Sequence, residues 1–377
     1  MNSRERVRTA LNLKEPDRIP LDLGSLVGTL TFKAQENLKK YIGIITNDSV
    51  YNRVEGTVVP NEKILEYLRV DTRYIYLNGP TGWQDVEMDN GKYMDEFGVI
   101  RKKVSWYYDM VKNPLSNVQY PEEIEKYAWP NPRDLGRYEG LYERAKWLYE
   151  NTEYALATAN TEIGSIFENA FCMVGFEKFM MDFYLNPMLN EALLDKWTEY
   201  WIAVNDELLD RVGNYIEFVT VGDDLTNQRG PHISPEIYRK FVKPRQKKLF
   251  SFIKSKTKAK IYYHLCGTIN EFADDLIEIG IDLLQPVQKE ATGNDLNELK
   301  KNYGSKISFS GGISQQKVLP FGTPEEVREE VRRAIRALAP GGGYLFITGH
   351  SIQPDVPPEN IVAAYDEAYN FGVYPIR

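Results

Sequence analysis

The chain has 377 residues, a formal net charge of −8, and 42% hydrophobic and 27% charged residues. This is the composition of a globular protein, and its acidic balance weighs against a nucleic-acid partner, because phosphate contacts need a basic surface. The sequence has no signal-peptide core and no run of about 18 apolar residues, so we expect a cytoplasmic protein that does not bind a membrane.

Eight short apolar runs recur along the chain, and most are followed by a segment with helical spacing. In chain order they are 18–23, 74–79, 154–160, 216–224, 260–267, 281–288, 306–312 and 344–350. Repeated βα units of this number favour a closed (β/α)₈ TIM barrel, an α/β fold, over an open sheet. One such barrel accounts for the whole chain, 1–377, as a single domain.

Helix-start and helix-end signals support this order of elements. Thr323, followed by Pro324 and Glu326, has the pattern of a capping box, and Ser234 before a proline begins another helix. Pro244 is expected to kink or divide that second helix. A long helix is predicted from Asn186 to a left-handed cap at Gly213.

Residues 80–130 interrupt the βα rhythm between the second and third predicted strands. Asp-Asn-Gly and Glu-Phe-Gly sequences, typical of turns, separate aromatic-rich runs in this segment. We therefore predict β-hairpins inserted in a βα loop, placed over the barrel mouth as a lid or a partner surface.

Polar side chains gather where the predicted strands end, which is the face of a TIM barrel that carries its chemistry. In chain order they are Asn160, Glu162, Asp223, Asp224, His264, Cys266, Gln285, Gln288, Ser310 and His350. Two of the chain's three histidines and one of its two cysteines are therefore expected on one face. Asp223 and Asp224 are adjacent on a strand, so only one of them is expected to reach the cavity.

His264 and Cys266 are two residues apart on a predicted strand, so both side chains point to the same side. Imidazole and thiolate suit zinc, which takes three protein ligands at catalytic sites. His350 can supply the third ligand, with Asp223, Asp224 and Glu162 as reserves. A buried cysteine is often simply a small apolar residue, so the spacing alone leaves that alternative open.

The sequence resembles the uroporphyrinogen decarboxylase superfamily. The most specific pieces are "GDDLTNQRGPHISPEIYRKFVKP", "HLCG", "SGGIS" and "TGHSIQPDVPPENIVAAYDEA". The resemblance implies a TIM barrel and one of two chemistries, which are cofactor-free decarboxylation of uroporphyrinogen and zinc-dependent methyl transfer involving corrinoids.

The decarboxylase pattern is only partly present. Its arginine-containing stretch after the first strand reads "LDLGSLVGTL" here, its second-strand aspartate corresponds to Asn78, and its third-loop tyrosine has no counterpart in "TEIGSIFENAF". A substrate with eight carboxylates would need such cations. His350 is the one position that matches the decarboxylase motif.

The methyltransferase pattern has a His-x-Cys pair at strand five, which His264 and Cys266 match, and a cysteine at strand eight, where His350 stands here. The resemblance thus implies a zinc-dependent methyltransferase that moves a methyl group between a corrinoid and a thiol or methyl ether, with Zn²⁺ on these three residues.

For the remaining positions, we expect catalytic roles for Glu162, Asp223 and His350, and cofactor contacts from Asn160, Asp224, Gln285 and Gln288. The corrinoid signature Asp-x-His-x-x-Gly is absent from the sequence, so any cobalamin is expected on a separate protein partner. A homodimer is a further expectation. The alternatives are a metal-free decarboxylase and a barrel that binds a corrinoid or tetrapyrrole without catalysis.

Overall fold

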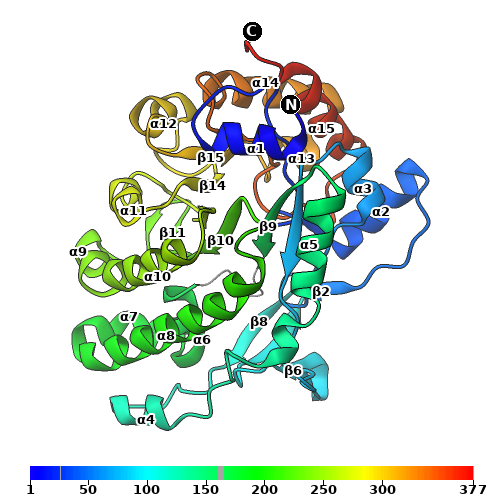
Figure 1. Ribbon diagram of the computed structural model, residues 1–377. Helices are drawn as coiled ribbons and strands as arrows, with labels where there is room; N and C mark the ends of the chain where they lie inside the picture. Colours follow the sequence, from blue (N-terminus) through cyan, green and yellow to red (C-terminus); the bar gives the residue numbers. More distant parts are fainter. Residues whose placement is uncertain (26, 160–164, 377) are drawn as a thin grey trace.

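The computed structural model describes residues 1–25, 27–159 and 165–376. They form an α/β barrel around a curved sheet of seven parallel strands in the order β16-β15-β14-β13-β10-β9-β4 (Figure 1). These strands are β4 (Thr72–Tyr76), β9 (Ala155–Ala159), β10 (Phe218–Gly222), β13 (Lys260–His264), β14 (Leu283–Val287), β15 (Ser308–Gly311) and β16 (Tyr344–Leu345). Six of them lie within a run that the apolar pattern predicts, and β4 overlaps the predicted run 74–79 but begins two residues before it.

The first predicted strand, 18–23, forms an isolated parallel bridge between Leu21 and Phe346 instead of a regular strand. The Asp22 N–H donates to the Phe346 carbonyl at 2.8 Å, and the Asp71 N–H donates to the Leu21 carbonyl at 2.8 Å. This segment therefore joins the two edges of the sheet, next to β16 and next to β4. Its ladder is short because Pro20 has no N–H to donate.

Helices surround the strands (Figure 1). They are α1 (Ser3–Leu11), α2 (Phe32–Ile42), α3 (Glu62–Tyr67), α4 (Pro121–Lys126), α5 (Leu141–Asn151), α6 (Phe167–Val174), α7 (Phe176–Leu185), α8 (Pro187–Val212), α9 (Pro235–Ile237), α10 (Lys243–Lys256), α11 (Ala273–Ile279), α12 (Leu296–Tyr303), α13 (Val318–Phe321), α14 (Pro324–Leu338) and α15 (Pro358–Phe371). Short 3₁₀ segments are η1 (Asp89–Gly91) and η2 (Leu135–Tyr138), and a π-helical turn, η3 (Tyr238–Val242), joins α9 to α10.

The helix-start predictions are confirmed, and one helix-end prediction is wrong. Thr323 caps α14 in a reciprocal capping box, and the π-helical turn interrupts the helix just before Pro244. Gly213, however, has a φ of −58°, so it is not in the left-handed region. Its N–H donates to the Leu209 carbonyl at 2.9 Å, and this bond continues the helical pattern through the glycine.

The insertion after β4 is an antiparallel sheet, as the turn signals predict. Its strands are β5 (Val86–Met88), β6 (Lys92–Met94), β7 (Ile100–Val104) and β8 (Tyr107–Lys112). The Tyr108 N–H donates to the Val54 carbonyl at 3.0 Å, and the Tyr107 hydroxyl donates to Gln353, which follows β16. The insertion therefore contacts a loop at the carboxyl end of the barrel.

Two smaller antiparallel sheets complete the fold. Their strands are β1 (Leu30–Thr31), β2 (Val50–Asn52) and β3 (Thr57–Val58) in the first, and β11 (Thr226–Asn227) and β12 (Gly230–Pro231) in the second. The β2–β3 hairpin spans the chain between α2 and α3, and the Tyr108 bond above ties it to the insertion.

The barrel interior is filled by one apolar cluster that includes residues of α1. Val7 and Leu11 of α1 pack with Phe218 and Tyr262, whose rings stack with centroids 5.4 Å apart. The Arg4 N–H donates to the carbonyl of Glu153, just before β9 begins. The helix α1 therefore covers the amino ends of the strands, and the polar residues gather at the opposite end.

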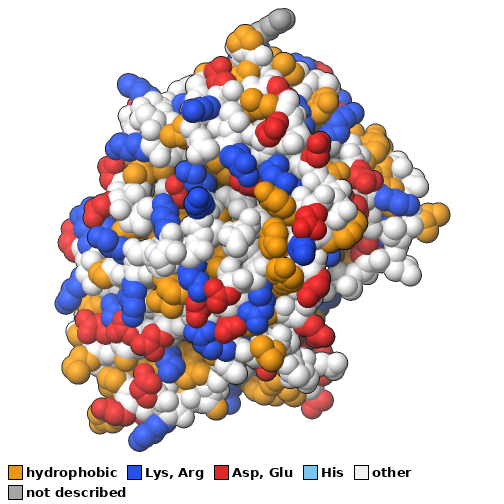
Figure 2. All heavy atoms as spheres, in the orientation of Figure 1, with side chains coloured by type: hydrophobic (Ala, Val, Ile, Leu, Met, Phe, Trp, Pro, Cys, Tyr) orange, Lys and Arg blue, Asp and Glu red, His pale blue; other side chains and the backbone are white. Residues whose placement is uncertain are grey.

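The face of the molecule drawn in Figure 2 carries acidic and basic side chains interspersed, with hydrophobic side chains in small groups between them. No helix within the described residues is long and apolar enough to span a membrane.

Candidate metal centre

The strand β13 presents two of the candidate ligands. His264 ends the strand and is 3% exposed, and Cys266 follows two residues later. The Cys266 Sγ lies 3.2 Å from the His264 Nε2, so both side chains point to the same side, as the strand alternation predicts. Gly267 allows the turn that follows: its φ is +93°, and a Cβ there would lie 2.4 Å from the Asn227 carbonyl oxygen.

Gln285 of β14 fixes the tautomer of His264. Its Oε1 lies 2.6 Å from the His264 Nδ1, and its Nε2 donates to the Gly349 carbonyl at 2.5 Å. A carbonyl only accepts, so the amide nitrogen must face Gly349, and the amide oxygen must accept a hydrogen bond from the Nδ1–H of His264. The lone pair of His264 is therefore on Nε2, which faces Cys266.

His350 reaches the same place from the loop after β16. Gly349 precedes it with a φ of +115°, a conformation that L side chains rarely adopt. Gln315 supports the loop by donating to the carbonyls of Thr348 and His350, the latter at 3.1 Å. Because Gln285 bonds to the Gly349 carbonyl, one glutamine links the His264 ring to the peptide that carries His350.

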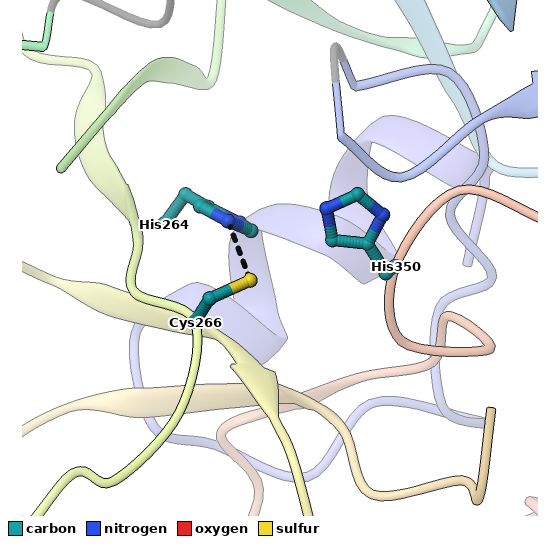
Figure 3. A group of neighbouring side chains, drawn as sticks. All are labelled: His264, Cys266 and His350. Atoms are coloured by element: carbon teal, nitrogen blue, oxygen red, sulfur yellow. Dashed lines mark hydrogen bonds between the residues drawn. The ribbon is translucent and has the colours of Figure 1, made fainter. Parts of the chain in front are cut away.

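The three side chains converge (Figure 3). Ligand atoms of His264, Cys266 and His350 all lie within 4.8 Å of one another. The two imidazole rings have their centroids 5.6 Å apart and an interplanar angle of 70°. The curvature of the barrel thus brings the loop after β16 next to the end of β13.

Burial controls the protonation of these groups. Burial, together with the charge of His350, lowers the pKa of His264 to about 3, while the Gln285 hydrogen bond opposes the shift. His264 is therefore neutral, which is the form that binds a metal ion. Burial raises the pKa of the Cys266 thiol well above its usual range, and the negative charges of Asp224, Glu55 and Glu168 add to that rise.

Asp224 faces the cluster, whereas Asp223 faces the helices. The Asp224 Oδ1 lies 3.7 Å from the His264 Nε2, is buried, and has no hydrogen-bond partner among the described residues. The Asp223 carboxylate accepts from the N–H groups of Phe167 and Glu168 and from the Gln246 amide at 2.9 to 3.0 Å. Only one aspartate faces the cluster, as the alternation predicts, and it is Asp224, whereas we expected the catalytic role for Asp223.

Gln285 and Gln288, expected as cofactor contacts, are hydrogen-bonded to His264 and to the turn after Cys266. Gln285 is fully buried, and both ends of its amide are bonded within the protein. The Gln288 Oε1 accepts from the Gly267 N–H at 2.8 Å and so holds the turn after Cys266. Asn160 and Glu162 lie outside the described residues.

Glu55, in the β2–β3 hairpin, is a site residue that sequence reasoning missed. Its Oε2 is buried with no hydrogen-bond partner among the described residues, and burial and the charge of Asp224 raise the pKa of Glu55 to about 7. Its charge in turn acts on the Cys266 thiol. Glu55 does not follow a barrel strand, so no pattern in the sequence points to it.

The residues present fit a zinc ion. Two imidazoles and a thiol are ligands that zinc prefers, and three protein ligands leave a position open for substrate. Asp224 adds an unpartnered buried oxygen beside them. A cation at this place would also offset the negative charges that hold the thiol in its protonated form.

The protein is therefore an α/β barrel protein of parallel strands, with a convergent His-Cys-His group at the carboxyl end of its strands. The chain belongs to the uroporphyrinogen decarboxylase family, whose sequence model matches residues 106–371.

Two uroporphyrinogen decarboxylases are similar to this chain at low sequence identity. The uroporphyrinogen decarboxylase of Ruthia magnifica subsp. Calyptogena magnifica is 25% identical over 225 residues, which are 59% of this chain and 59% of that protein. The uroporphyrinogen decarboxylase of Vesicomyosocius okutanii subsp. Calyptogena okutanii is 24% identical over 275 residues, or 69% and 71% of the two chains.

Among solved structures, a methyltransferase from Methanosarcina mazei superposes with a TM-score of 0.68 and 19% sequence identity, over 98% of this chain and 99% of that one. At this identity the likeness establishes the fold. The barrel architecture is thus shared along essentially the whole chain.

Proposed function

We propose that the protein is a zinc-dependent methyltransferase that moves a methyl group between a corrinoid, carried by a separate protein, and a thiol or methyl ether. The observation that carries the proposal is the convergence of His264, Cys266 and His350 within 4.8 Å. When bound, zinc would act as a Lewis acid that lowers the pKa of a thiol or polarises an ether oxygen. A cofactor-free decarboxylation, the alternative that the resemblance implies, would leave this ligand set without a role.

The protein's own side chains would do the positioning. His264 Nε2, Cys266 Sγ and a His350 ring nitrogen would hold the ion, and Gln285 keeps the lone pair of His264 aimed at it. Asp224 Oδ1 is free to accept a hydrogen bond from a substrate, so we assign it the role that the sequence suggested for Asp223. Cytoplasmic location, a corrinoid-protein partner and a homodimer complete the proposal.

The test is a metal analysis combined with a methyl-transfer assay on the purified protein. We expect close to one zinc per chain, removal of zinc and activity by a chelator, and return of both when zinc is added back. Activity would be followed as demethylation of methylcobalamin by thiols, and as methylation of reduced cobalamin by methyl ethers. A protein that is free of zinc when purified from zinc-containing medium, and that decarboxylates uroporphyrinogen, would contradict the proposal.

Replacing Gln285 by alanine tests the positioning of His264. Without the amide oxygen the imidazole loses its fixed tautomer and orientation, so zinc affinity should fall by about 10- to 100-fold. The measurement is competition with a chromogenic chelator. The control is Gln35→Ala, because Gln35 is also fully buried but bonds to Asn61, outside the cluster. Equal affinity in the two variants would refute this role.

A further inference from the structure

Two carboxylates from different elements approach the His-Cys-His cluster without a counter-charge. Asp224 follows β10, and Glu55 lies in the β2–β3 hairpin. Each has one buried oxygen with no hydrogen-bond partner among the described residues. The Asp224 side chain as a whole is 39% exposed, so a small molecule can reach it. A buried carboxylate oxygen without a hydrogen bond is costly, so these two atoms point to a partner that binds beside the cluster.

No lysine or arginine within the described part of the chain offsets these charges. The groups that act on Asp224 are His350, His232 and the Cys266 backbone, and Asp224 is the charged group that acts on Glu55. Arg53, two residues from Glu55, pairs instead with Glu87 and lies over the Tyr93 ring. Among the described residues, the surroundings of the cluster therefore have acidic groups and no fixed cation.

A bound zinc ion would not use up this negative charge. The dication is balanced in part by the Cys266 thiolate, and the carboxylates of Asp224 and Glu55 then leave one net negative charge. Tyr107 of the insertion lies near Glu55, and its electron-rich ring face suits a neighbouring cation. The surroundings are thus complementary to a monocation and unfavourable for an anion.

We propose that the substrate carries a positively charged nitrogen close to its reacting sulfur or ether oxygen, and that Glu55 and Asp224 select it. This inference rests on the proposed methyl transfer for the reacting atom, whereas the charge selection stands on the carboxylates alone. A sulfonate or carboxylate at the same position of the substrate would meet two like charges. Glu55, on a hairpin tied to the insertion, would be the specificity-determining residue.

A series of small methyl ethers that differ only in charge tests the selection. The probes are 2-methoxyethylammonium, 2-methoxyethanol and 2-methoxyethanesulfonate, which share the methoxyethyl group. Their binding to the zinc-loaded protein would be measured by calorimetry at about pH 8, where the amine is protonated and carboxylates are ionised. We expect the cation to bind about tenfold more tightly than the alcohol, and the sulfonate to bind more weakly than both.

The variant Glu55→Gln removes one charge and keeps the shape of the side chain. It should reduce the preference for the cation over the alcohol from about tenfold to about threefold, because Asp224 remains, and leave the affinity for the alcohol nearly unchanged. The matched control is Glu122→Gln, an exposed glutamate on α4. Tighter binding of the sulfonate, or an unchanged preference in Glu55→Gln, would overturn the inference.

The same measurements separate this inference from the proposed function. A protein that binds zinc and transfers methyl groups but prefers the sulfonate would keep the proposed function and refute the charge selection. A protein without zinc that still prefers the ammonium probe, with the preference reduced in Glu55→Gln, would keep the charge selection and refute the proposed function.

Discussion

Replacing Cys266 by serine should yield a protein that folds normally but contains almost no zinc and has lost methyl transfer. Serine keeps the size of the side chain, but its hydroxyl is a poor zinc ligand compared with a thiolate. Two histidines would remain, and the loss of supporting residues around a zinc site alone costs 10- to 100-fold in affinity or activity. Removing a ligand should therefore lower activity by more than about 100-fold. Metal content and methyl transfer would be measured on the same preparation.

The chain has a matched control in its other cysteine. Cys172, in α6, is partly buried like Cys266, and both are free of disulfide bonds. It lies outside the convergent cluster, so Cys172→Ser should keep its zinc and its activity. Equal zinc in the two variants, or loss of zinc in both, would show that the cluster is not the metal site.

Local chemistry explains why the sequence predicts most of the barrel. The runs at 154–160, 216–224 and 260–267 are apolar because parallel strands are buried on both faces, and each contains a strand of the central sheet. The capping box joins Thr323 to Glu326 by hydrogen bonds between residues three apart in the chain, so the local sequence is enough to predict it. The left-handed cap predicted at Gly213 is wrong because glycine permits that conformation without requiring it.

The sequence predicts only those features of the site that follow from the alternation of side chains along a strand. The alternation of a strand places His264 and Cys266 on one side, and it also indicates that one of Asp223 and Asp224 faces inward. It cannot tell which of the two, because that depends on where β10 leaves the sheet. The distance from His350 to His264 depends on the curvature of the whole barrel. Glu55 comes from a hairpin outside the βα repeat, so only the folded chain places it near Cys266.

The largest expected effect on stability follows from replacing Asp223 by alanine. Its buried carboxylate accepts from Ser165, from the N–H groups of Ile166, Phe167 and Glu168 at the start of α6, and from Gln246. Alanine would leave these buried donors without a partner, and it would remove a negative charge from the N-terminus of a helix. We expect a loss of about 3–5 kcal/mol in the free energy of unfolding.

The neighbouring aspartate supplies the comparison that makes this prediction specific. Burial raises the pKa of Asp223 to about 6, so denaturant unfolding would be measured near pH 8, where its carboxylate is ionised. Asp224→Ala should shift the unfolding midpoint much less, because Asp224 has one backbone hydrogen bond, from Cys266, and its Oδ1 has no partner among the described residues. It should instead weaken binding of the ammonium probe. If the two variants were equally stable, the assignment of Asp223 to the anchoring of α6 would be wrong. The assignment of separate structural and substrate-binding roles to Asp223 and Asp224 would then be wrong as well.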